Sequence, residues 1–122
     1  MPFAVSDSVS QVLASALDGV AERQRVTADN IANVDTPGFR ATSVDFETQL
    51  RAAINGGDFA RGTAVGVEVT STPTDTPVGA NGNNVDLRKE TMAAVQSQFQ
   101  YQILTRAVSD RYSLIKTAVT GQ

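Results

Sequence analysis

The sequence predicts a mainly α fold, in which long N- and C-terminal helices pack as a coiled-coil-like pair and flank an irregular, partly β, flexible middle segment. Apolar residues recur at steps of three and four over residues 6–33 and again over residues 86–120, as they do in amphipathic helices. The stretch between them is rich in Gly, Pro, Ser and Thr, which interrupt helices. We expect one structural unit with three segments, residues 1–34, 35–84 and 85–122.

The N-terminal helix is predicted from an apolar stripe that includes Leu13, Ala16, Val20 and Ile31. Gly19 interrupts the pattern and costs about 1 kcal/mol relative to alanine in a helix. The expected polar face carries Asp18, Glu22, Arg23 and Arg25. At ~1.5 Å per residue the helix is roughly 40 Å long, too long to be covered by so small a globule. We therefore expect neighbouring chains to cover part of it.

A structural joint is predicted where this helix ends, at Asn30-Ile31-Ala32-Asn33 and Thr36-Pro37-Gly38-Phe39. Asn30 and Asn33 lie three apart, so a helix places both carboxamides on one face. Their donors and acceptors suit holding a neighbouring backbone in place. Pro37 and Gly38 fit the two central positions of a tight turn, which leaves Phe39 to dock the emerging segment. Taken alone, the same residues fit an ordinary helix end followed by a turn.

The middle segment has weaker signals. Residues 65–70 alternate between apolar and other residues and predict a short strand or hairpin arm. Residues 71–84 have the composition of a flexible linker, exposed or ordered on assembly. Phe46 and Leu50, four apart, form a possible docking edge in an extended or helical peptide. Packing of these two side chains against the helices is the alternative.

The C-terminal helix is predicted over residues 86–120, where neither Gly nor Pro interrupts the pattern. It carries two adjacent apolar stripes, which indicate a helix that buries a wide face or contacts more than one neighbour. Packing against the N-terminal helix is the simplest interpretation. The packing candidates are Met92, Val95 and Phe99 on one stripe and Tyr101, Leu104, Val108 and Ile115 on the other.

Composition excludes several classes of function. The net charge of −3 and the lack of a basic run argue against nucleic-acid binding. The chain has no Cys and no His, which removes the commonest transition-metal ligands. Neither a membrane-spanning run nor a cleavable signal peptide is expected. Asp45 with Glu47, and Ser113 with Lys116, are better explained as exposed helix or loop residues than as catalytic pairs. We expect no enzyme, no metal and no cofactor.

The joint sequence NIANVDTPGF closely resembles the N-terminal signature of bacterial flagellar rod and hook proteins, the axial family. Arg40-Ala41, residues 44–47, residues 82–90 and Tyr101-Gln102 resemble the FlgB-type members, which form the proximal rod of the basal body. The resemblance covers most of the chain except roughly residues 55–80.

This resemblance implies a structural subunit that polymerises helically with other rod proteins, within the periplasm-spanning rod of the basal body. It implies contacts with a membrane-ring or adaptor protein at the rod base and with the type III export gate, for which Phe46 and Leu50 form a candidate recognition motif. Another axial rod subunit of the same family is the nearest alternative. A soluble helical adaptor that forms a closed complex is an alternative from another class.

Overall fold

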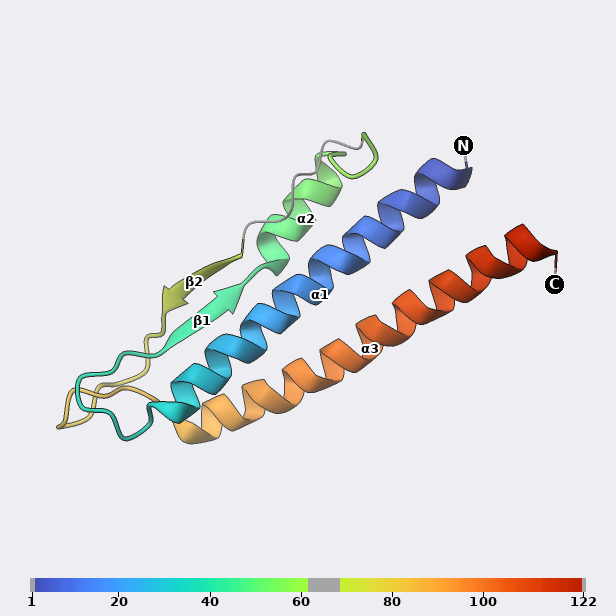
Figure 1. Ribbon diagram of the computed structural model, residues 1–122. Coiled ribbons are helices and arrows are strands. Elements are labelled where there is room, and N and C mark those ends of the chain that lie inside the picture. Colours follow the sequence, from blue (N-terminus) through green and yellow to red (C-terminus); the bar gives the residue numbers. More distant parts are fainter. Residues whose placement is uncertain (1, 62–68, 122) are drawn as a thin grey trace.

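The computed structural model describes residues 2–61 and 69–121. Within them, α1 (Pro2–Ala32) and α3 (Leu87–Thr120) are the long helices, and β1 (Thr42–Asp45), α2 (Glu47–Asn55) and β2 (Thr70–Pro73) lie between them in sequence. α1 and α3 run antiparallel and side by side, with β1, β2 and α2 on the opposite side of α1 (Figure 1). The predicted mainly α fold with a partly β middle is confirmed.

α1 is the central element because it packs on both sides. Gly19, Arg23, Val26 and Asn30 recur at steps of four, three and four, which places them on one helical face. This face meets the middle segment. The core formed there contains Ala16, Val20, Val26, Val44 and Phe46, with Leu50, Val69 and Leu104 packed against it. A core with so few large side chains makes polar contacts important for holding the layers together.

The two strands form an antiparallel ladder, with Thr42 opposite Pro73 and Asp45 opposite Thr70. Residues 65–68 of the predicted strand lie outside the described residues, and the observed strand begins at Thr70. Most of the predicted linker over residues 71–84 is exposed and irregular, but its two ends are ordered by the fold. β2 continues to Pro73, and the side chains of Asn83 and Asn84 are buried. Hydrogen bonds, which composition does not show, order this segment.

α3 packs on α1 through positions that recur at a heptad-like spacing. They are Glu90, Ala94, Ser97, Leu104, Val108 and Arg111. Ser97 is completely buried, as expected for a small residue where two helices approach closely. Gln98 and Gln100 add polar links, because their side-chain oxygens accept hydrogen bonds from Gln24 and Arg23 of α1.

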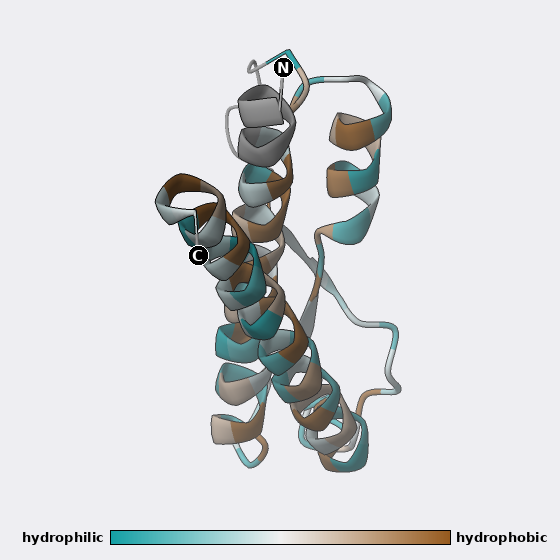
Figure 2. Cartoon of the chain, turned by 90° about the vertical axis from the view of Figure 1, so that its right-hand side faces the viewer, coloured by the Kyte–Doolittle hydropathy of each residue, from teal (hydrophilic) through white to brown (hydrophobic). Residues whose placement is uncertain are grey.

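The other apolar stripe of α3 does not pack on α1. Met92, Val95 and Phe99 are 59%, 52% and 61% exposed, so their predicted packing against the N-terminal helix is wrong within the subunit. Tyr101 and Ile115 are also exposed. One helix covers only part of α3's apolar surface, and α1 is occupied on its other side by the middle segment. In Figure 2, α3 crosses in front of α1, and hydrophobic and hydrophilic residues alternate along it.

Candidate assembly site

Asn30 fixes the middle segment to the end of α1. Its carboxamide is buried, with 1% of the residue exposed. The side-chain Nδ2 donates to the Thr42 carbonyl at 2.7 Å, and Oδ1 accepts from the Thr42 N–H at 3.3 Å. A side chain thus satisfies both backbone groups of one strand residue, as a neighbouring strand would. This is the backbone-holding role that the sequence suggested for the amide pair.

Asn33 acts differently, because it lies just beyond the end of α1, in the turn that follows Ala32. Its Nδ2 donates to the Asp29 carbonyl at 2.8 Å, and its Oδ1 accepts from the Thr36 hydroxyl at 3.1 Å. These bonds finish the helix end and start the following turn. In that turn the Phe39 N–H donates to the Thr36 carbonyl at 3.2 Å, and Gly38 has a φ of +76°, as a type II turn requires.

The loop before α3 completes the joint from the other side. Asn83 Nδ2 donates to the carbonyls of Asn33 at 2.9 Å and Thr36 at 2.8 Å. Asn84 Oδ1 accepts from the Ala41 N–H at 2.6 Å. These contacts join residues 30–42 to the segment that leads into α3. No structural role was predicted for Asn83 and Asn84 from the sequence. Their position directly after a glycine and just before a helix was the one feature that could have indicated such a role.

Two glycines allow the loops to touch. The Gly38 N–H donates to the Asn81 carbonyl at 2.9 Å, and a Cβ on Gly82 would lie 3.2 Å from the Gly38 Cα. Gly82 has a φ of +80°, a conformation that other residues rarely adopt. We call the hydrogen-bonded contact between residues 30–42 and 81–85 the loop joint.

The remaining predicted residues of this motif lie around the loop joint. Ile31 is half-buried and lines a groove between the helices with Ala94 and Gln98. Phe39 is half-buried, and its carbonyl accepts from the Asn84 N–H at 3.3 Å. Ala32 and Pro37 are exposed. The loop joint is therefore held mainly by backbone and amide hydrogen bonds.

Asn30→Ala is expected to lower the free energy of unfolding by about 2 to 3 kcal/mol, because the N–H and carbonyl of Thr42 both lose their partner. Urea unfolding followed by circular dichroism measures this change. Asn33→Ala is the matched control and should cost about 1 kcal/mol or less, since its side chain bonds are local and solvent-exposed. Equal losses in the two variants would contradict the role assigned to Asn30.

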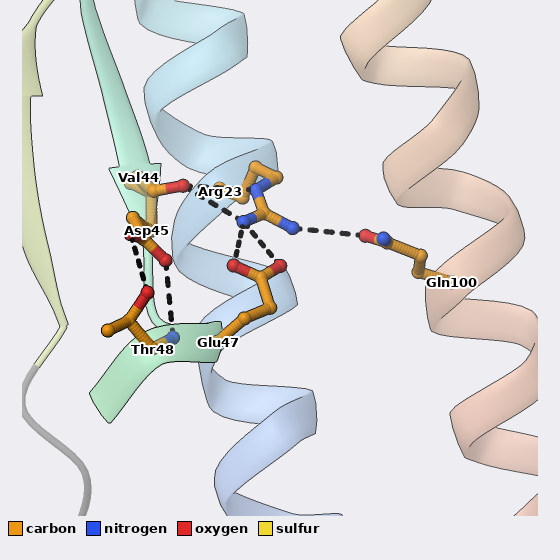
Figure 3. Close-up of polar contacts among 6 residues, drawn as sticks. All are labelled: Arg23, Val44, Asp45, Glu47, Thr48 and Gln100. Carbon is orange, nitrogen blue, oxygen red and sulfur yellow. Dashed lines mark hydrogen bonds and ion pairs between the residues drawn. The ribbon is translucent and has the colours of Figure 1, made fainter. Parts of the chain in front are cut away.

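Arg23 ties three elements together at the middle of α1 (Figure 3). Its guanidinium donates to the Val44 carbonyl at 2.9 Å, pairs with Glu47 at 2.6 Å, and donates to Gln100 of α3 at 3.2 Å. It also lies 4.8 Å from the centroid of the Phe46 ring, within the range of a cation–π contact. The prediction that Arg23 belongs to the polar face is wrong, because this side chain is only 19% exposed.

Asp45 and Glu47 have structural partners rather than a shared site. Asp45 accepts from the N–H and hydroxyl of Thr48 at 3.4 and 3.1 Å, which starts α2. These hydrogen bonds hold the pKa of Asp45 below its ordinary value. Because the folded-state pKa is depressed, the resulting stabilisation is present at neutral pH and is lost as the pH falls through that pKa. Glu47 pairs with Arg23, as described above.

Phe46 and Leu50 form part of the core. Phe46 is 4% exposed, and Leu50 packs against the same cluster. The Leu50 N–H donates to the Phe46 carbonyl at 2.9 Å, which places both residues at the first turn of α2. The packing alternative is thus observed in the folded subunit, and a recognition role for Phe46 requires that this segment be unfolded.

Arg23→Met is expected to cost about 1 to 2 kcal/mol, because it leaves the Val44 carbonyl and Glu47 without their partner. Arg25→Met provides a matched control. Arg25 also pairs with a carboxylate, Glu22, at 2.6 Å, but it is 65% exposed, and such pairs contribute about 0.5 kcal/mol or less. The measurement is the urea midpoint of each variant at unchanged slope. A loss as small for Arg23→Met as for Arg25→Met would refute the three-way role.

The exposed stripe of α3 is the second feature of the candidate site. We define the α3 outer face as Met92, Val95, Phe99 and Ile103, each more than half exposed. Beside it runs an open groove of about 360 Å³, lined by Ala94, Val95, Gln98, Phe99 and Gln102. No charged residue occurs from Thr91 to Thr105. A large uncharged apolar surface of this kind marks an interaction site more often than a free surface.

No cluster of potential metal ligands occurs among residues 2–61 and 69–121. In the same part of the chain, no helix combines the length and hydrophobicity needed to cross a membrane.

Comparison with known proteins agrees with this architecture. The family described as "Flagella basal body rod protein" matches residues 11–40, a range that includes Arg23 and residues 30–40 of the loop joint. The flagellar basal body rod protein FlgB of Bacillus subtilis is 32% identical over 91% of this chain and 92% of its own length. The chain belongs to the FlgB family.

Other members of the FlgB family show similar coverage. FlgB of Escherichia coli K12 is 33% identical over 84% of this chain and 86% of its own length. FlgB of Borreliella burgdorferi is 29% identical over 81% and 86%. The similarity therefore extends over both long helices and the middle segment, and makes this chain a structural flagellar rod protein.

Proposed function

We propose that this FlgB-family chain is a subunit of the proximal rod of the flagellar basal body and polymerises helically with other rod proteins into a drive shaft. The observation that carries the proposal is the α3 outer face, which the subunit leaves uncovered. Burial of this face between subunits would gain about 25 cal/mol per Å² of apolar surface. Contacts that join different surfaces of successive subunits do not close, and so they build a filament.

The loop joint and Arg23 supply the rigidity that such a shaft needs. The antiparallel helices are connected through hydrogen bonds at one end and through Arg23 with Gln100 near the middle. Torque applied to one helix is then passed to the other within a subunit. The role is mechanical and structural, and it requires neither an active site nor a cofactor.

The proposed partners are other rod proteins, a second copy of the chain, a membrane-ring or adaptor protein at the rod base, and the type III export gate. For export, Phe46 and Leu50 are the proposed recognition residues. Since Phe46 is buried in the folded subunit, the gate would engage it before residues 42–50 pack on α1. The proposed location is the periplasm-spanning rod, without nucleic-acid binding or membrane insertion.

Electron microscopy of basal bodies from the source bacterium with this gene deleted tests the proposal. We expect membrane rings without a rod, and restored rods when the gene is supplied. Intact rods and normal swimming in the deletion strain would overturn it. A closed complex of fixed stoichiometry with one soluble partner would instead identify an adaptor.

A further inference from the structure

The chain contains two Asn-Gly steps, Asn55-Gly56 at the end of α2 and Asn81-Gly82 in the loop joint. An asparagine before glycine is prone to deamidation, because no Cβ shields the following amide nitrogen. That nitrogen loses its proton to solvent and attacks Cγ of the asparagine, so a C–N bond forms. The bond from Cγ to the side-chain nitrogen breaks, and ammonia leaves. Water then opens the succinimide ring to give aspartate or isoaspartate.

The surroundings of Asn81 hold it away from this reaction. The Gly82 N–H donates to the Gly79 carbonyl at 3.0 Å, and the Asn81 carbonyl accepts from Gly38 at 2.9 Å. The Asn81 side-chain oxygen accepts from the Asn83 N–H at 3.2 Å. The attacking Gly82 nitrogen, the Asn81 carbonyl and the Asn81 carboxamide are thus each restrained by a hydrogen bond. The partners in two of these bonds, Gly38 and Asn83, belong to the loop joint.

Asn55 is restrained only by local bonds. The Gly56 N–H donates to the Ala52 carbonyl at 2.8 Å, and the N–H groups of Gly57 and Asp58 donate to the carbonyls of Ile54 and Ala53 at 3.1 Å. All three bonds lie at the end of a nine-residue helix, and none reaches a distant segment as the bond from Gly38 to Asn81 does. Helix ends fray without the rest of the fold opening. Both asparagines are exposed to water, so the difference between them lies in the restraint of the backbone. The chain therefore contains two Asn-Gly sites, of which Asn81 is the better protected from deamidation and Asn55 the less protected.

We propose that Asn81 is a latent deamidation site whose reactivity is controlled by the loop joint. Deamidation of Asn81 requires that the contacts to Gly38, Gly79 and Asn83 open together. Formation of isoaspartate then lengthens the backbone by one methylene group between residue 81 and Gly82. The close approach of Gly38 and Gly82 leaves no room for the longer chain, so the reaction would uncouple the two loops irreversibly. This inference concerns the chain itself and does not depend on its assembly.

Peptide mapping by mass spectrometry, with aspartate and isoaspartate separated, tests the proposal on the purified full-length chain at mildly alkaline pH. In the folded protein we expect Asn81 to deamidate at least about tenfold more slowly than Asn55, and in concentrated urea at a similar rate, because protection reflects local opening. Equal rates at the two sites in the folded protein would overturn the proposal. This comparison needs no substitution.

Asn83→Ala separates the loop joint from general stability. It removes the side-chain bonds to the carbonyls of Asn33 and Thr36 but leaves α2 untouched. We expect the rate at Asn81 to rise about tenfold while the rate at Asn55 stays the same. An unchanged rate at Asn81, or an equal rise at both sites, would contradict control by the loop joint.

Discussion

Replacing Gly19 with alanine is expected to lower the free energy of unfolding by about 2 kcal/mol, although alanine is the better helix former by about 1 kcal/mol. A Cβ on Gly19 would lie 2.5 Å from Cδ1 and Cδ2 of Phe46, well inside van der Waals contact. Phe46 is 4% exposed and lies against Val44 and Arg23, so the ring cannot move aside without opening the core. The absence of a side chain at Gly19 thus leaves room for the Phe46 ring.

A double-mutant cycle gives the sharper test. In a Phe46→Ala background the ring is absent, so Gly19→Ala is expected to raise stability by about 1 kcal/mol through helix propensity alone. Phe46→Ala by itself should cost about 3 kcal/mol or more. Urea unfolding of the four proteins measures every side of the cycle. If Gly19→Ala had the same sign in both backgrounds, the contact with Phe46 would not be the cause.

Gly19 also shows which parts of the fold could be predicted from the sequence alone. Periodicity predicted α1 and α3, because apolar steps of three and four extend over both helices. It missed the face of α1 that meets the middle segment, since two of that face's four residues are Gly19 and Arg23. Without knowledge of the contacting residue, a glycine in a helix predicts only lower helix stability, and an arginine predicts a solvent-exposed charge. Their partners, Phe46 and Val44, lie more than twenty residues further along the chain.

The loop joint was predicted in part. The turn at Pro37 and Gly38 follows from local backbone preferences, which a sequence displays directly. The roles of Asn83 and Asn84 depend on hydrogen bonds to residues more than forty positions away. Composition placed residues 71–84 in a linker because linkers and hydrogen-bonded loops use the same small polar residues. Only the fold distinguishes them.

For α3, periodicity predicted two apolar stripes but not which surfaces they contact. The seam toward α1 is the less apolar of the two surfaces, with buried Glu90 and Ser97, while the α3 outer face has larger side chains. Hydrophobicity alone would have buried the outer face first. Heptad-like spacing identifies the seam, and the stripe that remains uncovered supports assembly with other subunits.

Phe99→Asp is expected to abolish rod assembly and swimming while leaving the isolated subunit folded. Phe99 is 61% exposed in the subunit, so its replacement should change the free energy of unfolding by only about 0.5 kcal/mol. In a subunit interface the new carboxylate would be desolvated without a cation nearby, at a cost of about 2 kcal/mol or more in each contact. Because every subunit repeats the contact, the cost recurs along the filament. Complementation of the deletion strain, scored by basal-body micrographs and swimming, measures the effect.

Two variants on the same helix separate assembly from folding. Leu104→Asp places the same charge against the core and should unfold the subunit itself, which circular dichroism detects. Ser109→Asp lies at an exposed position outside the α3 outer face and should leave both folding and rods intact. If Phe99→Asp blocks rod assembly in a folded subunit and Ser109→Asp does not, the assembly surface lies on the α3 outer face. Normal rods with Phe99→Asp would remove that surface from the interface and leave the exposed side of α1 as the face to test.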